Sequence, residues 1–345
     1  MKIAETTSNI LPVSIVIPTH NRAHMIKRAV DSVLKQCIAG DEVIVVDDGS
    51  TDETAEVLRL YTEQIIYLRV ENGGAGRARN IGMYKARNPI IGFLDSDDEW
   101  MPGKLKLQRT FLQACPEVLF CFSDLAYRCI SEKMRYRGMF YRYDPPLMEH
   151  ILGKGVPFSS IAALPEEYSD FLVHVGDLYP AQMERAFVQV NTLMIRSNII
   201  QNENIRFPED LRTREDWEFV GRISREGLAA YLDCKTSWYN HHDDPQLIKL
   251  DYLIYLEARL KMLERLWGAD SDFLKDHLER YQEVHDEVYW NFIRELLCHG
   301  KAVEARTQLA RAQHIPIQFH ILSRLPKLAN RLAFKLRDTI FHDEF

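Results

Sequence analysis

The stretch IIGFLDSDDEW, residues 90–100, joins a short apolar run to three carboxylates within four positions. IIGFL (90–94) predicts a buried strand because it is apolar and begins with β-branched residues. Asp95, Asp97 and Asp98 follow directly, and their charges would repel one another in a folded chain. Carboxylates offset by two residues on one short turn suit a hard divalent cation that binds through oxygen. The alternative is capping of the next helix, for which one aspartate would suffice.

Strands and helices alternate along the whole first part of the chain. Short apolar runs predict buried strands, and segments with apolar residues at helical spacing predict the helices between them. This alternation indicates crossover units, and hence an α/β fold with a Rossmann-like, mainly parallel sheet flanked by helices. The predicted strands are 13–17, 42–46, 65–70, 90–94 and 118–124, and the predicted helices are 22–36, 52–61, 77–87 and 103–114.

Polar clusters follow three of these predicted strands. PTHNR follows the first strand, DDGSTD the second and DSDD the fourth. Ligands of open parallel sheets bind beyond the carboxyl ends of the strands, so the sequence predicts a binding crevice at this rim. The rim collects Thr19, Asn21, Arg22, Asp47, Asp48, Asp95, Asp97 and Asp98.

A glycine-rich segment, ENGGAGRARN (71–80), enters one of the predicted helices. Its glycines permit close approach of a ligand to the backbone, and a helix start favours anions. Arg77 and Arg79 are natural partners for a diphosphate. The segment is not a P-loop, since no Gly-Lys-Ser/Thr follows it.

The segment REDW (214–217) places Glu215 and Asp216 side by side in a predicted helix, 211–227. Adjacent helical residues point about 100° apart, so one of the two is expected to face the crevice. A carboxylate there could act as a general base toward a hydroxyl. A surface ion pair with a neighbouring arginine is the alternative.

Two histidines, His241 and His242, end a predicted strand over 229–242. They could supply a metal ligand or a phosphate contact, and a solvated strand end is the alternative.

Between 125 and about 185 the alternation of strands and helices weakens, and prolines and aromatic residues predict loops over the rim. FVQVNTLMIR (187–196) predicts a further strand.

Length and composition exclude several classes of protein. The chain has 345 residues and a net charge of −7, which argues against a general nucleic-acid binder. Its six cysteines include no CxxC pair and are interpreted as reduced thiols of a cytosolic protein. The N-terminal stretch lacks the apolar core of a signal peptide, and no apolar run reaches the roughly 18 residues of a membrane span. A cytoplasmic location is therefore expected.

The character of the sequence changes to nearly all helix after residue 245. We expect two domains, 1–245 and 246–345. In the last predicted helix, 321–338, a leucine stripe lies beside a basic stripe formed by Arg324, Lys327, Arg331 and Lys335. This pattern fits peripheral attachment to an anionic membrane surface. A helix packed on its own domain, with its basic residues in solvent, is the alternative.

Four ordered motifs resemble the family 2 glycosyltransferases of the GT-A fold. They are VSIVIPTHNR, VIVVDDGSTDET, ENGGAGRARNIGM and IIGFLDSDDEW. REDWEFVGRISREG is similar to the second acidic motif of the family and extends the resemblance to about residue 242. The helical tail matches no motif that we can assign.

The resemblance implies a role for each matching position. Asp95, Ser96 and Asp97 correspond to the DxD signature of the family, with Asp97 as the direct ligand of Mn²⁺ or Mg²⁺. His241 or His242 is a further candidate metal ligand. Asp98 is expected to hold the turn. The remaining positions implied to bind the nucleotide-sugar are Thr19, Asn21, Arg22, Asp48, Arg77 and Arg79.

Asp216 resembles the catalytic base, and Glu215 would bind or orient the acceptor. The implied reaction is inverting transfer of one hexosyl or N-acetylhexosaminyl unit from a nucleotide-diphosphate sugar, by family habit a UDP-sugar. A hydroxyl of a glycan or lipid-linked molecule would accept it, in surface polysaccharide or glycoconjugate synthesis. The chain lacks the Gln-x-x-Arg-Trp motif of processive members, which favours single transfers.

Two other functions stay open at this point. A sugar-1-phosphate nucleotidyltransferase would share a related sheet, but it would need a glycine-rich basic loop directly after the first strand. A non-catalytic nucleotide-sugar-binding scaffold would use the helical tail for partners. The motifs leave the donor base, the acceptor and the oligomeric state open.

Overall fold

The computed structural model describes residues 10–129, 145–201, 205–242, 252–310 and 324. Contacts within the chain divide it into two compact units. Unit 1 comprises Met1–Leu211 and Glu215–Pro245, and unit 2 comprises Arg212–Arg214 and Gln246–Phe345. Unit 1 contains the sheet, and the described part of unit 2 is helical.

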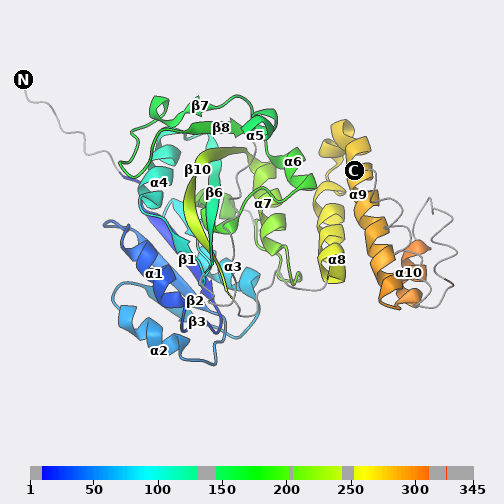
Figure 1. Ribbon diagram of the computed structural model, residues 1–345, viewed down its shortest axis with the longest axis horizontal. Helices are drawn as coiled ribbons and strands as arrows, with labels where there is room; N and C mark the ends of the chain where they lie inside the picture. Colours follow the sequence, from blue (N-terminus) through cyan, green and yellow to red (C-terminus); the bar gives the residue numbers. More distant parts are fainter. Residues whose placement is uncertain (1–9, 130–144, 202–204, 243–251, 311–323, 325–345) are drawn as a thin grey trace, which may run out of the picture. The chain divides into compact units, whose positions relative to one another are not determined.

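Unit 1 is built on one ten-stranded sheet (Figure 1). The strand order is β3-β2-β1-β4-β9-β6-β10-β8-β7, and β5 pairs with β10. The strands are β1 (Val13–Thr19), β2 (Glu42–Asp47), β3 (Ile66–Arg69), β4 (Ile90–Phe93), β5 (Glu99–Trp100), β6 (Val118–Cys129), β7 (Val156–Pro157), β8 (Leu172–Gly176), β9 (Met194–Arg196) and β10 (Leu228–His241).

The predicted α/β fold is confirmed, although the sheet as a whole is mixed. β1 pairs in parallel with β2 and β4, β2 with β3, and β6 with β10. The short strands β5, β7, β8 and β9 join in antiparallel orientation. The parallel strands bring the carboxyl ends of β1, β2 and β4 to one edge, where the sequence predicts the binding crevice.

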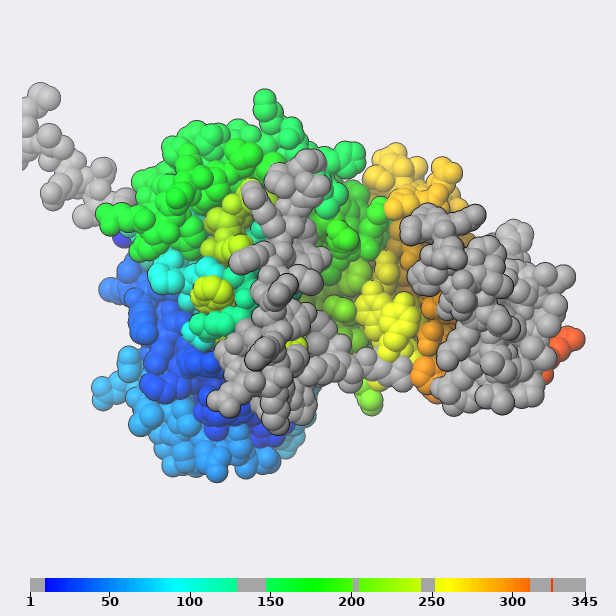
Figure 2. Space-filling model, in the orientation of Figure 1, coloured from blue at the N-terminus to red at the C-terminus, as the bar shows by residue number. Residues whose placement is uncertain are grey.

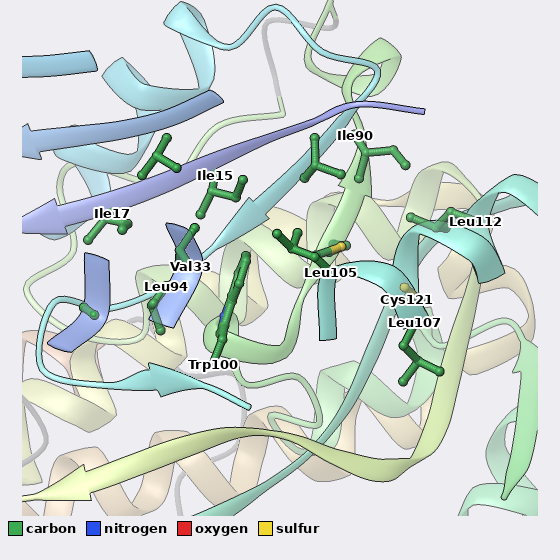
Figure 3. Packing of buried hydrophobic residues seen from close by; sticks show 14 of the residues in the cluster. Ile15, Ile17, Val33, Ile90, Leu94, Trp100, Leu105, Leu107, Leu112 and Cys121 are labelled. Atoms are coloured by element: carbon green, nitrogen blue, oxygen red, sulfur yellow. The ribbon is translucent and has the colours of Figure 1, made fainter. Parts of the chain in front are cut away.

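Helices cover both faces of the sheet, and alternate residues of β1 point to the two sides. Ile15 and Ile17 belong to a core with α1 and α4, whereas Val16 belongs to a core with α3 and α7. Figure 3 shows the first core, in which Val33 of α1 and Leu105 of α4 approach the sheet. The helices of unit 1 are α1 (Ile26–Leu34), α2 (Thr54–Leu58), α3 (Ala75–Lys85), α4 (Lys104–Ala114), α5 (Pro145–Leu152), α6 (Tyr179–Glu184) and α7 (Glu215–Glu226).

Helix α3 packs unusually closely on β1. A Cβ atom at Gly82 would lie 2.3 Å from Cγ1 of Val16, so only glycine permits this approach. The close contact fixes the helix that carries both arginines of the glycine-rich segment. In the space-filling view, the early part of unit 1 (blue) lies at the bottom, and the segments around β7 and β8 (green) lie at the top (Figure 2).

Two predictions of secondary structure need correction. The sequence predicts one strand over 187–196, whereas a 3₁₀ turn occupies Val190–Thr192 and only Met194–Arg196 form a strand. Because β9 runs antiparallel to β4, this turn lies beside the carboxyl end of β4. The segment 125–185, expected as loops, contains the end of β6 together with α5, β7, β8 and α6.

Among the described residues of unit 1, one lysine is buried in the core, Lys104 at the start of α4. Its ammonium group donates to Oε1 of Gln108 and, at 3.2 Å, to the carbonyl oxygen of Thr192, and it lies 4.9 Å from the centre of the Trp100 ring. Burial lowers the pKa of Lys104 from 10.5 to about 7. The folded protein therefore holds this proton less tightly than the unfolded chain does.

We expect the stability of the protein to rise between pH 7 and pH 9. In that range the unfolded chain binds more protons at Lys104 than the folded chain, and unfolding free energy then increases with pH by up to about 1.4 kcal/mol per unit. Melting temperatures at pH 7, 8 and 9 test this for the wild type and for Lys104→Met, in which the slope should be lost. The control is Lys106→Met, which removes an exposed lysine of the same helix. An equal slope in Lys104→Met would contradict the assignment.

Unit 2 contains α8 (Tyr252–Met262), a π-helical turn (Leu263–Trp267), α9 (Ser271–Cys298) and α10 (Ala302–Leu309). Asp270 caps α9 by accepting a hydrogen bond from the backbone N–H of Phe273 at 3.1 Å. Within the described residues, no helix combines the length and the hydropathy that a bilayer crossing needs. Apart from Arg324, the predicted helix 321–338 lies outside the described residues.

Candidate active site

The loop after β1 and the loop after β2 are joined by hydrogen bonds at the predicted rim. Asn21 adopts a positive φ of 51°, and its Oδ1 accepts from the backbone N–H of Thr51 at 2.7 Å. Its own backbone N–H donates to Oγ of Ser50 at 2.9 Å. Asn21, predicted to bind the nucleotide, thus shapes the DGST turn in this structure.

Asp48 connects β2 to the glycine-rich segment. Its Oδ1 accepts from the N–H of Gly73 and its Oδ2 from the N–H of Gly74, both at 2.8 Å. A carboxylate has lone pairs left for a ligand after two such bonds. Thr19, the last residue of β1, lies beside this loop with its hydroxyl oxygen buried and without a hydrogen-bond partner within the described residues. Such a group can accept or donate to a bound molecule.

The acidic turn after β4 holds its three carboxylates in different surroundings. The N–H of Asp98 donates to the carbonyl oxygen of Asp95 at 3.1 Å, which closes the turn. The side chains of Asp95 and Asp97 are 31% and 24% exposed, and Ser96 between them is buried. These two carboxylates are therefore the ones that a ligand can reach.

Asp98 is buried and holds the turn, as the sequence predicts. Its Oδ1 accepts from the backbone N–H of Asn240 at 2.7 Å, and its Oδ2 accepts from the side-chain amide of Asn191. Burial raises the pKa of Asp98 well above its ordinary value, and the charges of Asp97 and Asp95 raise it further. The hydrogen bonds from the two asparagines oppose this rise only in part.

Asp97 lies between two groups that can carry positive charge. Nε2 of His242 is 3.1 Å from its Oδ2, and Nε of Arg22 is 3.7 Å from the same atom. Burial alone would raise the pKa of Asp97, but the hydrogen bond from His242 and the charge of Arg22 hold it below its ordinary value. These two neighbours therefore favour the ionised form of the Asp97 carboxylate.

The donor set at Asp97 fits a divalent ion that shares its coordination with phosphate. The hydrogen bond of 3.1 Å keeps Asp97 Oδ2 and His242 Nε2 close enough to bind one ion together, once the proton between them has left. Mg²⁺ and Mn²⁺ sites commonly use one or two protein ligands, with phosphate oxygens and water in the remaining positions. Among the described residues, no three His, Cys, Asp or Glu side chains gather as a complete metal site. Of the two candidate histidines, His242 is the one whose contact with Asp97 is described.

One buried guanidinium connects the acidic turn with the Glu215–Asp216 pair. Nη2 of Arg79 donates to Oδ1 of Asp95 at 2.7 Å, and Nη1 donates to Oε1 of Glu215 at 2.9 Å. Burial alone would lower the pKa of Arg79, but the neighbouring carboxylates of Asp95 and Glu215 raise it. Arg79 is therefore a fixed cation that joins two acidic motifs, and its bond to Glu215 links α3 to α7 across 136 residues of sequence.

The two residues of the acidic pair have different environments. Glu215 is 8% exposed and is held by Arg79, whereas Asp216 is half-buried at the start of α7. The charge of Asp216 contributes to the raised pKa of Arg79, so the carboxylate lies near the same network. Asp216 is thus the member of the pair that keeps more contact with solvent.

Helix α3 also positions the segment that leads into α7. Asn80 donates to the carbonyl oxygen of Phe207 at 2.9 Å and accepts from the N–H of the same residue at 2.9 Å. A Cβ at Gly76 would lie 3.0 Å from the carbonyl oxygen of Pro208, so glycine allows the segment to pass. Arg77, by contrast, donates to the carbonyl oxygen of Glu71 at 2.9 Å and folds over Gly73.

Comparison with known proteins identifies the family. The sequence profile described as "Glycosyl transferase family 2" matches residues 14–162. This chain carries a family 2 glycosyltransferase domain. The matched range contains the glycine-rich segment and the acidic turn, while Glu215, Asp216 and His242 lie beyond it.

This chain matches its curated relatives over different shares of their length. An uncharacterized glycosyltransferase of Rickettsia bellii is 32% identical over 225 residues, which are 62% of this chain and 28% of that protein. Two further Rickettsia relatives are matched over 29% and 30% of their length, so the chain spans less than a third of these proteins. The putative teichuronic acid biosynthesis glycosyltransferase TuaG of Bacillus subtilis is 29% identical over 224 residues, which are 64% of this chain and 74% of that protein.

Solved structures show the same fold. TarS residues 1–349 of S. aureus align with a TM-score of 0.58 at 18% identity, over 93% of this chain and 89% of that one. The mannosyltransferase PcManGT of Pyrobaculum calidifontis, solved with GDP-Man and Mn²⁺, aligns with a TM-score of 0.51 at 16% identity, over 98% and 89%. These alignments support the GT-A fold for the glycosyltransferase domain.

Proposed function

We propose that this protein is an inverting, metal-dependent glycosyltransferase that moves one sugar from a nucleotide-diphosphate sugar to an acceptor hydroxyl. The observation that carries the proposal is the arrangement around Arg79. This guanidinium bonds to the first aspartate of the acidic turn and to the glutamate that precedes Asp216. A candidate cation-binding turn and a candidate base therefore belong to one network in unit 1.

The donor diphosphate would bind over the acidic turn. Asp97 and His242 are the proposed protein ligands of Mn²⁺ or Mg²⁺, and Asp95 lies beside them. A divalent ion supplies Lewis-acid stabilisation to a departing diphosphate when it is bound. Nε of Arg22 lies 3.7 Å from Oδ2 of Asp97, and this guanidinium would neutralise phosphate charge.

Asp216 is the proposed general base. Its carboxylate would take the proton of the acceptor hydroxyl, whose oxygen forms a bond to the anomeric carbon. The bond between that carbon and the diphosphate oxygen breaks, and its electron pair leaves with the nucleotide. Attack from the face opposite the leaving group inverts the anomeric centre. Glu215, held by Arg79, would orient the acceptor or the base.

The donor is proposed to be a UDP-sugar, bound by Thr19, Asp48 and the glycine-rich segment with Arg77. TarS has been solved with UDP-GlcNAc and with UDP, whereas PcManGT has been solved with GDP-Man. The name of TuaG points to polysaccharide synthesis, and we propose a glycan or lipid-linked acceptor for this protein too. A cytoplasmic location with attachment of 321–338 to an anionic membrane is part of the same proposal.

Nucleotide release tests the proposal. Purified protein is incubated with UDP-GlcNAc, UDP-glucose or GDP-mannose and Mn²⁺, and free nucleotide and pyrophosphate are measured. We expect release of nucleoside diphosphate, its loss with EDTA, and a decrease of about 100-fold in Asp97→Asn because metal-bound stabilisation of the diphosphate is lost. Glu63→Gln, which alters an exposed carboxylate of unit 1, is the control and should behave as wild type.

The other products separate the remaining functions. Pyrophosphate would indicate a nucleotidyltransferase, and binding of nucleotide without turnover would indicate a scaffold. Proton NMR of the glycosylated product establishes whether the anomeric configuration is inverted. Retained configuration would contradict the proposed role of Asp216.

A further inference from the structure

The acidic turn is held from both sides by asparagines that belong to none of the glycosyltransferase motifs. Asn191 lies in the 3₁₀ turn before β9 and is 4% exposed. Its Oδ1 accepts from the backbone N–H of Asp95 at 2.7 Å, and its Nδ2 donates to Oδ2 of Asp98. One amide therefore spans the turn from its first residue to its last.

The second asparagine, Asn240 of β10, holds the same turn from the other side. Its backbone N–H donates to Oδ1 of Asp98 at 2.7 Å, and its side-chain amide donates to the carbonyl oxygen of Asp97 at 2.8 Å. The turn thus receives bonds at Asp95, Asp97 and Asp98. The side chain of Asp97 is left to face His242 and Arg22.

The backbone around Asn191 is itself fixed by four buried donors. Nε1 of Trp100 and Oγ of Ser237 each donate to its carbonyl oxygen at 2.9 Å. The next carbonyl, of Thr192, accepts from Nε2 of Gln108 at 2.7 Å and from Lys104 at 3.2 Å. Since α4, β5 and β10 supply these donors, the position of the Asn191 amide is determined by the core.

We propose that Asn191 is a positioning residue that holds the acidic turn in the shape that binds a divalent cation together with a nucleoside diphosphate. This inference rests on the proposed function of the turn. An asparagine suits the position because its amide accepts from Asp95 and donates to Asp98 at the same time. An aspartate side chain in its place would still accept from Asp95, but a carboxylate oxygen would stand where the amide N–H now donates to Asp98. The turn would then open, and Asp97 would lose its orientation.

Mn²⁺ binding in the presence of 1 mM UDP or 1 mM GDP tests the proposal. Free Mn²⁺ is followed by its electron paramagnetic resonance signal. A nucleotide concentration of about 1 mM saturates a nucleotide site whose Kd is about 10 µM. We expect Asn191→Asp to raise the Kd for Mn²⁺ by about 10–100-fold, the usual effect of removing a residue that orients metal ligands.

A double variant, Asn191→Asp with Asp98→Asn, exchanges the two side chains. It restores the hydrogen bond between them in the opposite direction, because the amide now carried by the acidic turn can donate to the carboxylate now carried by the 3₁₀ turn. The oxygen of that amide can still accept from the N–H of Asn240, so the contact with β10 is kept as well. The exchange should recover the wild-type Kd to within about threefold, if orientation of the turn is what the single variant loses.

Asn88→Asp is the matched control. Asn88 precedes β4 at the opposite end of the strand, where its amide donates to the carbonyl oxygen of Gly40 at 2.9 Å. This variant makes the same change of charge and should leave the Kd unchanged. Melting temperatures of all variants establish that the proteins are folded. Asn191→Ser, which shortens the side chain without adding charge, replaces Asn191→Asp if that variant does not fold.

Two results would overturn the inference. One is a Kd within twofold of wild type in the folded single variant. The other is a weakened Kd that the exchange does not recover, since the loss would then come from disturbance of the core. Absence of Mn²⁺ binding by the wild-type protein with either nucleotide would contradict the proposed function itself, and it is therefore distinguished from failure of the positioning role.

Discussion

The Asp216→Asn variant is expected to lose about 10³-fold in kcat while it keeps the wild-type KM for the donor. A general base contributes about 10²–10⁴-fold to a proton transfer, and an amide cannot accept the proton of the acceptor hydroxyl. The donor KM should not change because Asp216 is not among the residues proposed to bind the nucleotide. Initial rates over a range of donor concentrations, at saturating Mn²⁺, give both constants.

A matched variant at the other end of the same helix controls for the change of charge. Glu226→Gln replaces an exposed carboxylate of α7 by an amide, and its kcat should stay within about twofold of wild type. A kcat for Asp216→Asn within tenfold of wild type would show that another group takes the proton. Glu215→Gln would then be examined first, although Arg79 already occupies that carboxylate.

The rim of the sheet could be predicted from the sequence because strand periodicity and the polar residues after each strand are local signals. β1, β2 and β4 are short apolar runs, and parallel pairing brings their carboxyl ends together whatever happens elsewhere in the fold. The acidic turn and Thr19 therefore share one edge in the structure. The motifs themselves carried the resemblance to the family.

The residues that support the acidic turn could not be predicted from the sequence, because their hydrogen-bond partners are distant in the chain. Asn191 bonds to Asp95 and Asp98, 96 and 93 residues away, and it sits in a segment whose apolar pattern predicts a plain strand. A buried asparagine in such a segment is the one local hint, since its amide must find partners. Asn240, which follows Trp238 and Tyr239 in β10, gives no stronger signal.

Arg79 shows a second limit of sequence reasoning. That Arg79 binds phosphate, as the glycine-rich segment suggests, stays a prediction, but the sequence gives no sign of its contacts with Asp95 and Glu215. Composition indicates which groups are charged, and only the fold decides whether a charge faces a ligand or another side chain. Asp48 follows the same rule, since both of its oxygens hold the glycine-rich segment.

The Arg79→Met variant is expected to be destabilised by about 3–5 kcal/mol and to lose activity. The methionine fills a similar volume, but it leaves the carboxylates of Asp95 and Glu215 without the cation that neutralises them. Removal of one partner from a buried ion pair costs about this much because the remaining charge is uncompensated. For a unit of this size the melting temperature should fall by about 10 °C, which differential scanning calorimetry measures.

Two further variants separate lost charge from lost packing. Arg87→Met removes an exposed arginine just after α3 and should leave the melting temperature unchanged. Adding Glu215→Gln to Arg79→Met neutralises one of the stranded carboxylates and should recover part of the lost stability, because the two changes act on one network. If the double variant is instead less stable by the sum of the two single effects, Arg79 contributes through its packing on the Phe207 ring, 5.3 Å from the guanidinium, and not through charge. The ion pairs would then not be what couples the acidic turn to the Glu215–Asp216 pair.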